Sequence, residues 1–541
     1  HNMASRLGRV VVCGERDLPR DLTRRGVRLD ADQVRRIVAA LDRACPPRVV
    51  PKARQQPGSF QVMPKPAAQF ALLSEDEILI ALRETACAEP IESWMTWLHP
   101  RQARLVAQRW SGPARVRGAA GTGKTVVALH RAKHLAAGGK RVLFTSFVRN
   151  LPTVQQQLFA RLAPGVPGRV EFVNIHAWAR RLLASRGVRL ELDDDGVESC
   201  FNLAWVHVGR GSALAELGSR EYWQEEVQDV IKSRGLTSYD DYAALRRVGR
   251  RLPLQSSQRE LVWDLYQEYE RLRIERGIHD WADVLTLALE SVNADPVEPA
   301  YDAVIVDEVQ DLSCVGVRLL HALVGDSRDG LLLVGDGQQA VYPGGFTLAE
   351  AGISVAGRAR VLDQNYRNGS EILRAALAVV ASDEYDDLDT DPVTGTRQVD
   401  IERDGGTVVR SVTPDPAAQA QALVEQIRRD NGEHGVRLGD MAVLCPTRAE
   451  SGHWHRVLTL AGIDVILLES YDGRTIDAVK IGTYQRAKGL EFAEVFVPDH
   501  ARVPAARRTV EGDDAYAERA SLERRQLFVA MTRARDLLWL G

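Results

Sequence analysis

The 541-residue sequence has few cysteines, no long apolar run and almost no net charge. Its six cysteines lie far apart without a C-x-x-C pair, which argues against a zinc ribbon or iron–sulfur cluster and indicates reduced thiols in a cytoplasmic protein. No apolar stretch approaches the roughly 20 residues that cross a bilayer, so we expect no membrane partner. The net charge of −3 does not indicate a nucleic-acid partner, although a local basic groove can still bind one.

The length and composition indicate a globular protein of several domains. A single core does not extend over 541 residues, and 45% hydrophobic with 26% charged residues is ordinary for a folded chain. We interpret residues 1–95 as a basic N-terminal extension and linker, because Lys and Arg outnumber Asp and Glu by 14 to 6 within residues 6–66. This segment either contacts nucleic acid or is a solvated surface.

An eight-residue stretch, GAAGTGKT, has the phosphate-loop spacing of a glycine, four residues and then Gly-Lys-Thr. Glycines let the backbone approach a polyphosphate closely, and successive N–H groups then face the anion. The lysine supplies a point charge for the β- and γ-phosphates, and the threonine hydroxyl can bind Mg²⁺. We therefore predict a nucleoside triphosphate site at Gly118, Ala119, Ala120, Gly121, Thr122, Gly123, Lys124 and Thr125.

Two apolar runs downstream end in polar side chains suited to the same site. The run Val304–Val306 leads into Asp307 and Glu308. In a phosphate-loop ATPase such a strand places an aspartate beside the metal, and a glutamate orients and deprotonates the attacking water. The run Leu331–Val334 is followed by Gln339, which can sense the γ-phosphate. An acidic surface turn is the alternative for the two carboxylates, and the upstream phosphate loop disfavours it.

Several strand ends carry aromatic or amide side chains, a pattern typical of contacts with a nucleic-acid strand. The strand expected at 141–145 leads to Phe147 and Asn150, and the strand from 170 leads to His176. Each aromatic can instead be core, which is the interpretation we favour for Trp178.

Two larger regions complete the organisation. Residues 180–290 are helical in pattern, with many charges and aromatics, and we interpret them as a mostly α-helical insertion. A second α/β block follows, with Arg533 near the end of an amphipathic helix from which it can reach a phosphate bound by the first block. Its expected elements are a helix at 416–429 and strands at 407–412, 441–445, 463–468, 478–483 and 494–498.

Taken together, these stretches resemble the ordered motifs of superfamily 1A helicases of the UvrD/Rep/PcrA type. The resemblance covers roughly residues 96–541. In order, the motifs are LHPRQ, GAAGTGKT, FTSFVRNL, VNIHAW, DWADVL, VIVDEVQDL, LLLVGDGQQAVY, LDQNYR, GTYQRAKGLEF and RRQLFVAMTRAR.

This resemblance implies an α/β fold of two RecA-like domains with ATP and Mg²⁺ between them. The first domain would comprise residues 96–180 and 285–360, the helical insertion 181–284, and the second domain 361–541. By the same resemblance, Thr125 and Asp307 hold the metal, Glu308 activates water, and Gln339 couples the γ-phosphate to the nucleic-acid side. The other implied nucleotide contacts are Gln102 at adenine, Arg131 and Tyr366 beside the base, Glu491 at the ribose, and Arg367 and Arg533 as arginine fingers.

The sequence also departs from this family in two places. Only 121 residues separate Arg367 from Lys488, so the second accessory insertion is expected to be missing and processive unwinding is in doubt. An aromatic that often follows the tyrosine of the VYPGG stretch is replaced by Gly344, with Phe346 as a possible substitute. The DNA contacts expected from the motifs are Phe147, Asn150, His176, Tyr342 and Phe346.

We therefore expect a DNA-dependent ATPase that acts as a 3′ to 5′ translocase or helicase on single-stranded DNA, including a 3′ tail on a duplex. We expect a monomer, with a protein partner left open. One alternative is an ATP-driven remodeller of a protein–nucleic acid complex, such as an RNA-polymerase-associated relative, with little duplex unwinding. Another is an ATP switch that binds DNA without moving along it.

Overall fold

The computed structural model describes residues 91–94, 98–166, 168–385, 387–388, 393–395, 399–508 and 511–541. The chain divides into two units, residues 1–104 and 105–541. The first contains the short helix α5 (Ile91–Trp94) and the start of α6 (Pro100–Ala107). Most of the expected basic extension, residues 1–90, lies outside the described residues.

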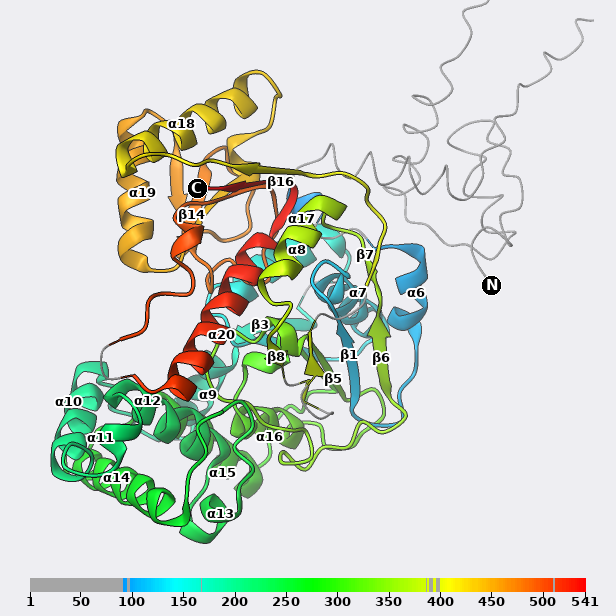
Figure 1. The fold of residues 1–541 in the computed structure, drawn as a ribbon. Coiled ribbons are helices and arrows are strands. Elements are labelled where there is room, and N and C mark those ends of the chain that lie inside the picture. Colours follow the sequence, from blue (N-terminus) through cyan, green and yellow to red (C-terminus); the bar gives the residue numbers. More distant parts are fainter. Residues whose placement is uncertain are drawn as a thin grey trace, which may run out of the picture. The chain divides into compact units, whose positions relative to one another are not determined.

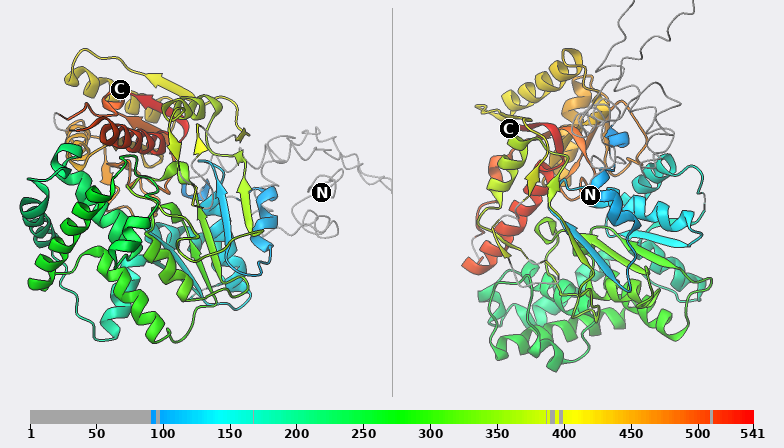
Figure 2. Two further views of the ribbon diagram at one scale, coloured as in Figure 1. Left: turned by 60° about the horizontal axis from the view of Figure 1, so that its bottom comes forward. Right: turned by 90° about the vertical axis from the view of Figure 1, so that its right-hand side faces the viewer.

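The first sheet has six parallel strands in the order β3-β2-β4-β5-β1-β6 (Figures 1 and 2). The inner strands β2, β4 and β5 are short, buried and largely apolar, as expected for a parallel sheet covered by helices on both faces. The inner strand β1 is also mostly buried, although it contains two arginines. The edge strands are more exposed. The strands are β1 (Ala114–Gly118), β2 (Val142–Ser146), β3 (Val170–Asn174), β4 (Ala303–Val306), β5 (Leu331–Gly335) and β6 (Ala359–Leu362).

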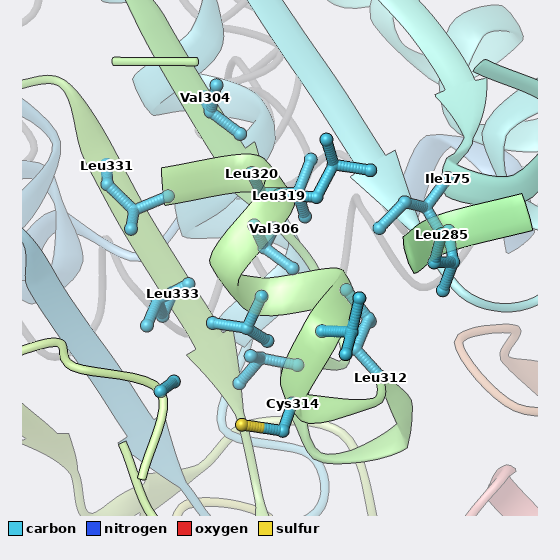
Figure 3. Packing of buried hydrophobic residues seen from close by; sticks show 14 of the residues in the cluster. Ile175, Leu285, Val304, Val306, Leu312, Cys314, Leu319, Leu320, Leu331 and Leu333 are labelled. Carbon is cyan, nitrogen blue, oxygen red and sulfur yellow. The ribbon is translucent and has the colours of Figure 1, made fainter. Parts of the chain in front are cut away.

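A large hydrophobic core lies between this sheet and the helices that pack on it (Figure 3). Apolar side chains of β4 and β5, among them Val304 and Leu333, meet Leu319 of α16. Each fully buried Val or Leu contributes about 1.5–3 kcal/mol relative to exposure, so this core is a major source of stability. The helices and short 3₁₀ turns connecting these strands are α7 (Lys124–Ala137), α8 (Leu151–Leu162), α9 (Ile175–Ser185), α15 (Trp281–Ala294), η3 (Val309–Asp311), α16 (Cys314–Ala322) and η4 (Gly337–Gln339).

A helical insertion between α9 and α15 has a core of its own. Its buried aromatics include Phe201, Trp223 and Tyr269, which pack in that core. Leu183 of α9 and Leu285 of α15 belong instead to the core of the first sheet, and the expected bounds 181–284 stay a prediction. The insertion contains α10 (Asp194–Ala204), the π-helix η1 (Trp205–Gly209), α11 (Leu214–Leu217), α12 (Arg220–Glu225), the π-helix η2 (Glu226–Lys232), α13 (Tyr239–Ala244) and α14 (Ser256–Glu275).

The second sheet also has six parallel strands, in the order β11-β16-β15-β12-β14-β13. All five strands expected from the sequence are present, and the helix expected at 416–429 is α18, so the α/β fold with two parallel sheets is confirmed. The elements are α17 (Ser370–Val379), β11 (Thr407–Arg410), α18 (Pro416–Gly432), η5 (Leu438–Asp440), β12 (Met441–Cys445), α19 (Arg448–Leu460), β13 (Val465–Leu467), β14 (Val479–Thr483), β15 (Phe492–Val497), η6 (His500–Arg502), α20 (Asp513–Met531) and β16 (Ala534–Leu540).

Short strand pairs connect the two sheets along the chain. β7 (Gln364–Asn365) pairs with β10 (Asp400–Ile401), and β8 (Glu384–Tyr385) pairs with β9 (Val393–Thr394). Among the described residues between Arg367 and Lys488, the helices are α17, α18, α19 and the turn η5, so this part of the chain holds no second helical insertion. Within the described ranges, none of the helices combines the length and apolar character needed to span a membrane.

Helix α20 joins the helical insertion to the second sheet (Figure 1, red). Ala515, in its first turn, is part of the core of the insertion, and Glu518 accepts hydrogen bonds from Arg250 and Tyr222. Its C-terminal half packs against α17 and leads into β16. A single helix therefore fixes the insertion to the last strand of the chain.

Glu226 is the buried charge on which we expect the insertion to depend. It accepts hydrogen bonds from Arg247 at 2.6 and 2.7 Å and from Arg250 at 3.0 Å. Burial disfavours the carboxylate, but Arg247 and Arg250 outweigh it and lower the pKa of Glu226 to about 2. Glu226→Gln leaves two buried guanidinium groups without this partner, so we expect a loss of about 3–5 kcal/mol in the stability of the insertion. Urea unfolding followed by tryptophan fluorescence measures this.

The matched control is Glu275→Gln, which removes an exposed ion pair with Arg271 on α14 and should change the transition little. Because the folded-state pKa of Glu226 is depressed, its contribution is full above the unfolded pKa of about 4.3 and is lost as pH falls toward 2. Equal transitions for the two variants would contradict the role given to Glu226.

Candidate nucleotide-binding site

The phosphate loop runs from the end of β1 into α7, and its glycines are required by the fold of the loop itself. Gly121 and Gly123 have φ values of 74° and 78°, in the left-handed region that L side chains rarely adopt. At Gly118 a Cβ would lie 2.6 Å from the carbonyl oxygen of Leu362, so the chain leaving β6 passes directly against the loop.

Lys124 is folded onto its own loop. Its Nζ donates to the carbonyl oxygens of Gly118 at 2.8 Å and Ala119 at 2.9 Å, and it lies 3.9 Å from Asp336. Burial lowers the pKa of Lys124, with Asp336 and Glu308 opposing the shift. Binding of a phosphate here would exchange two hydrogen bonds to neutral carbonyls for stronger bonds to an anion.

Thr125 and Asp307 form a pair of oxygen donors suited to Mg²⁺. Thr125 Oγ1 donates to Asp307 Oδ2 at 2.9 Å, and Gln155 Nε2 donates to the same oxygen at 2.7 Å. The other carboxylate oxygen, Oδ1, is buried without a hydrogen-bond partner. Burial and the nearby Glu308 raise the pKa of Asp307 to about 7. A hard cation would supply the absent partner and favour the charged carboxylate, so these residues fit Mg²⁺.

The surroundings of Glu308 favour its charged, carboxylate form. Its backbone φ of 55° is left-handed, and Gln310 Nε2 donates to its Oε2 at 2.6 Å. Burial favours the neutral acid, but Lys488, Lys124 and Arg533 together lower the pKa of Glu308 below its ordinary value. At neutral pH it is therefore in the form that accepts a proton from water.

The second half of the chain contributes two arginines to the site. Arg533, directly after α20, donates from Nη2 to Gln339 Oε1 at 2.8 Å, and Arg367 forms an ion pair with Glu491. Arg533 is only 1% exposed. Burial and the neighbouring Arg367 lower its pKa to about 9, so Arg533 is still charged at neutral pH.

These side chains meet in one cavity of about 20 Å³, enough for about one water molecule. Nucleotide binding therefore requires the two sheets to separate. The five residues predicted to act in ATP hydrolysis are Lys124, Glu308, Gln339, Arg367 and Arg533. All of them line this cavity, and their individual roles stay predictions. The lining residues are Gly121, Gly123, Lys124, Thr125, Val126, Glu308, Gln339, Arg367, Gly489, Glu491 and Arg533.

The three residues predicted to contact the adenine base do not line this cavity. Tyr366 lies beside the loop, where its N–H donates to the Gly121 carbonyl at 2.9 Å. Arg131 is buried and donates to Asp329 at 2.7 Å, outside the cavity lining. Gln102 lies on α6, in the first unit. The roles of these three residues stay predictions.

Lys488 is a buried residue of the site for which no role was expected from the sequence. It is fully buried on the connection between β14 and β15, and its Nζ lies 2.7 and 2.8 Å from the two oxygens of Asp311. The same nitrogen donates to the Gln339 carbonyl and lies 3.8 Å from Glu308. The sequence Ala-Lys-Gly gives no sign that its lysine is buried, because the partners of that lysine, Asp311 and Gln339, are distant in sequence.

Four aromatic side chains form a continuous row, which we call the aromatic row. Phe147 packs edge-on against Tyr342 at 4.8 Å and against His176 at 5.7 Å between ring centroids. His176 in turn meets Trp281 at 5.7 Å. Burial lowers the pKa of His176 to about 4, so it is neutral at pH 7. Trp281 is 42% exposed and was not predicted as a contact; its place after Asp280, before a helical pattern, was the available signal.

Two expected strand contacts are placed elsewhere. Phe346 is 4% exposed and packs in the core of the first sheet, which corrects the expectation that it presents a ring to a base. Asn150 donates to the Leu468 carbonyl at 2.9 Å and so ties α8 to the second sheet. At Gly344, a Cβ would lie 2.8 Å from the Asp229 carbonyl oxygen. The insertion therefore occupies the space that an aromatic would need at this position.

Comparison with known proteins agrees with this arrangement. The family model described as the UvrD/REP helicase N-terminal domain matches residues 98–355, and that of the UvrD-like helicase C-terminal domain matches residues 467–541. The chain belongs to the UvrD-like helicase family.

Relatives of this UvrD-like chain include two proteins of Mycobacterium tuberculosis (strain H37Rv). The ATP-dependent DNA helicase UvrD2 is 27% identical over 386 residues, 65% of this chain and 52% of the relative. The ATP-dependent DNA helicase UvrD1 is 25% identical over 410 residues, 69% and 50% respectively. The chain thus spans about half the length of these relatives. A solved C-terminal domain of a possible DNA helicase from Lactobacillus matches 32% of this chain and 86% of that domain, at 20% identity and a TM-score of 0.23, too low to support an argument.

Glu308→Gln should bind ATP and fail to hydrolyse it. The amide keeps the size and hydrogen bonding of the side chain but cannot accept a proton from water. We expect turnover to fall by at least about 10²-fold, with ATP affinity changed less than about threefold, measured by steady-state hydrolysis and by fluorescent-nucleotide titration. Near-normal turnover would remove Glu308 from the role of base.

Arg533→Ala should slow hydrolysis far more than it weakens ATP binding. An arginine finger acts on charge that develops in the transition state and typically contributes about 10³–10⁵ in rate. We expect kcat to fall by about 10³-fold and the ATP Kd to rise less than about tenfold. Arg374→Ala, an exposed arginine on α17, is the matched control. Parallel losses in kcat and affinity would identify Arg533 as a binding residue only.

Proposed function

We propose that this chain is a DNA-dependent ATPase that moves along single-stranded DNA in the 3′ to 5′ direction and can separate strands ahead of it. The observation that carries the proposal is the cavity between the two sheets. Segments that follow strands of the first sheet supply Lys124 and Glu308, and the second half of the chain supplies Arg367 and Arg533. Such a divided site is complete only when the sheets close on a nucleotide, which turns binding and hydrolysis into relative motion.

In this proposal, each side chain has a defined task. Lys124 leaves the two loop carbonyls and holds the β- and γ-phosphates. Thr125 and Asp307 would hold Mg²⁺, which neutralises phosphate charge when bound. Glu308 accepts the proton of the attacking water at its carboxylate. Arg533 shifts from Gln339 to the γ-phosphate as the transition state gains negative charge.

Contacts that lead from the nucleotide site to the aromatic row support coupling between ATP turnover and a bound nucleic acid. Gln339 accepts from Arg533 and, through its backbone carbonyl, from Lys488. Three residues later comes Tyr342, at one end of the aromatic row. A change in the bond to Gln339 therefore reaches the proposed DNA surface through directly packed residues. Bases stacked on exposed members of such a row contribute about 1–3 kcal/mol each.

An ATP-driven remodeller of a protein–nucleic acid complex is the second candidate. Two observations favour it: the described residues between Arg367 and Lys488 contain no second helical insertion, and Gly344 is packed against the helical insertion. Both reduce the surface available for engaging a duplex. A remodeller would keep the ATP site while pushing on a bound protein.

We expect single-stranded DNA to stimulate ATP turnover by at least about tenfold, because closure of the divided site is coupled to strand binding. We also expect faster displacement of streptavidin from a 5′-biotinylated strand than from a 3′-biotinylated one, since a 3′ to 5′ motor runs toward the 5′ end. Lys124→Ala is the inactive control. The reverse preference would overturn the polarity. Turnover unchanged by DNA would favour the remodeller, and stimulation without displacement would indicate an ATP switch.

A further inference from the structure

Helix α8 directs one buried glutamine at the proposed metal site. Gln155 is fully buried, and its Nε2 donates to Asp307 Oδ2 at 2.7 Å. The helix packs on β2 and β3 of the first sheet. Gln155 belongs neither to the phosphate loop nor to the segment after β4, it does not line the nucleotide cavity, and the proposed function gives it no task.

The hydrogen bonds around Asp307 fix its backbone and one of its side-chain oxygens. The Asp307 N–H donates to the Thr145 carbonyl of β2 at 2.9 Å, which holds the main chain at the end of β4. Oδ2 accepts from Thr125 and from Gln155, whereas Oδ1 has no partner among the described residues. The Thr125 hydroxyl is itself a proposed metal ligand. Gln155 is therefore the donor that can hold the carboxylate without binding the cation.

The other half of the Gln155 amide points to the same role. Its Oε1 is buried and has no hydrogen-bond partner among the described residues. A buried polar atom without a partner is costly, and in folded proteins a water or a ligand usually satisfies it. Mg²⁺ usually keeps several of its waters when it binds a protein. Such a water can donate to Oε1 while Nε2 keeps its bond to Asp307.

Helix α8 is also the surface on which part of the second half of the chain rests. We call residues 468–475, between β13 and β14, the seating segment. Asn150, at the N-terminus of α8, donates to the Leu468 carbonyl at 2.9 Å. Arg161, in the last turn of the helix, donates to Thr475 Oγ1 at 3.2 Å. The seating segment thus contacts α8 at both of its ends.

The closest contact of the seating segment is with the residue next to Gln155. Gly473 has a φ of 91°, and a Cβ there would lie 2.9 Å from Val154 Cα and 3.1 Å from the Val154 carbonyl oxygen. Val154 directly precedes Gln155 and is also buried. Because protein interiors are close-packed, a displacement of the helix at Val154 moves Gln155 as well. The position of the seating segment therefore affects the bond to Asp307.

We propose that Gln155 is a positioning residue for Asp307, and that contact with the seating segment holds it where Asp307 binds Mg²⁺ best. Closure of the two halves then prepares the metal site, and by reciprocity a bound cation favours closure. A glutamine that only fills space would account for the burial of Gln155 but not for an oxygen without a partner. The proposal rests on the proposed function in taking Asp307 as a ligand of Mg²⁺, and it requires no movement along DNA.

The test uses Gln155→Met, which keeps the length of the side chain but removes its amide. Binding of a fluorescent, non-hydrolysable ATP analogue is titrated at increasing Mg²⁺ concentrations, and Mn²⁺ binding is measured directly by electron paramagnetic resonance. We expect the Mg²⁺ concentration at half-maximal binding and the Mn²⁺ Kd to rise about 10–100-fold, the usual effect of losing a hydrogen bond to a metal ligand. Excess Mg²⁺ should restore nucleotide binding, which it would not do if the site had lost its fold. Unchanged metal affinities would overturn the proposal.

The matched control is Gln156→Met, the same change at the next residue of the same helix, where the side chain is exposed. It should leave both metal affinities unchanged. Thermal melting without metal or nucleotide measures folding separately. If Gln155→Met melts below the unaltered protein, Gln155→Asn replaces it, because this side chain keeps the amide but is one methylene shorter and so withdrawn from Asp307. Its metal affinity should fall in the same way, and an unchanged affinity would again overturn the proposal.

A pair of glycine variants tests the part played by the seating segment. Gly473 and Gly462 both have positive φ values, 91° and 72°, so alanine is strained at either position. Only at Gly473 would the added Cβ meet α8, because at Gly462 it would meet nothing within 4 Å. We expect Gly473→Ala to raise the half-maximal Mg²⁺ concentration at least about fivefold, and Gly462→Ala to leave it unchanged. Equal effects of the two variants would overturn the coupling through α8.

Asp307→Asn separates this proposal from the proposed function. It should abolish the dependence of nucleotide binding on Mg²⁺. If that dependence survives, Asp307 is not the metal ligand, and the metal assignment and the positioning role are both wrong. If Asp307→Asn loses it while Gln155→Met keeps the metal affinity of the unaltered protein, only the positioning role is wrong. None of these measurements contains DNA, so their results stand whatever DNA does to ATP turnover.

Discussion

One buried hydrogen bond, from Arg533 of the second half to Gln339 of the first, joins the two sheets at the nucleotide site. A guanidinium that is 1% exposed must find partners inside the protein, because an unpaired buried charge is strongly destabilising. Arg533 finds them in two carbonyl oxygens, in the Thr532 hydroxyl and in this one amide oxygen. The amide is a weaker partner than a phosphate. The contact is therefore one that a nucleotide can replace, and the closed cavity of about 20 Å³ depends on it.

A second contact between the two halves of the chain lies on the path from the nucleotide site to the aromatic row. Lys488, from the second sheet, is held by Asp311 and by the Gln339 backbone, so the two buried cations meet at one residue of the first sheet. The chain from there leads to Tyr342 and the aromatic row. Coupling over such a path needs only packed neighbours with alternative partners, and Gln339 has two such partners in Arg533 and Lys488. Release of Arg533 toward a phosphate would leave the Lys488 contact with the Gln339 backbone in place.

Local features of the site could be predicted from the sequence, and features created by packing could not. The phosphate loop depends on the spacing between β1 and α7, and the Asp307-Glu308 pair follows the end of β4, so each could be located from its own stretch of sequence. Parallel strands are short apolar runs, and all of those expected in the second block are present. By contrast, the burial of Lys488 and of Phe346 is decided by surfaces distant in sequence. A lysine or a phenylalanine in a loop has the same appearance in sequence whether such a surface covers it or not.

The helical insertion explains why no aromatic side chain takes the place of Gly344. Gly344 does not merely lack an aromatic, because Asp229 fills the space that a side chain would need there, and a Cβ at Gly249 would in turn lie 2.8 Å from the Gly344 carbonyl oxygen. The insertion can approach so closely because both Gly249 and Gly344 have φ values of 82°, which only glycine adopts readily.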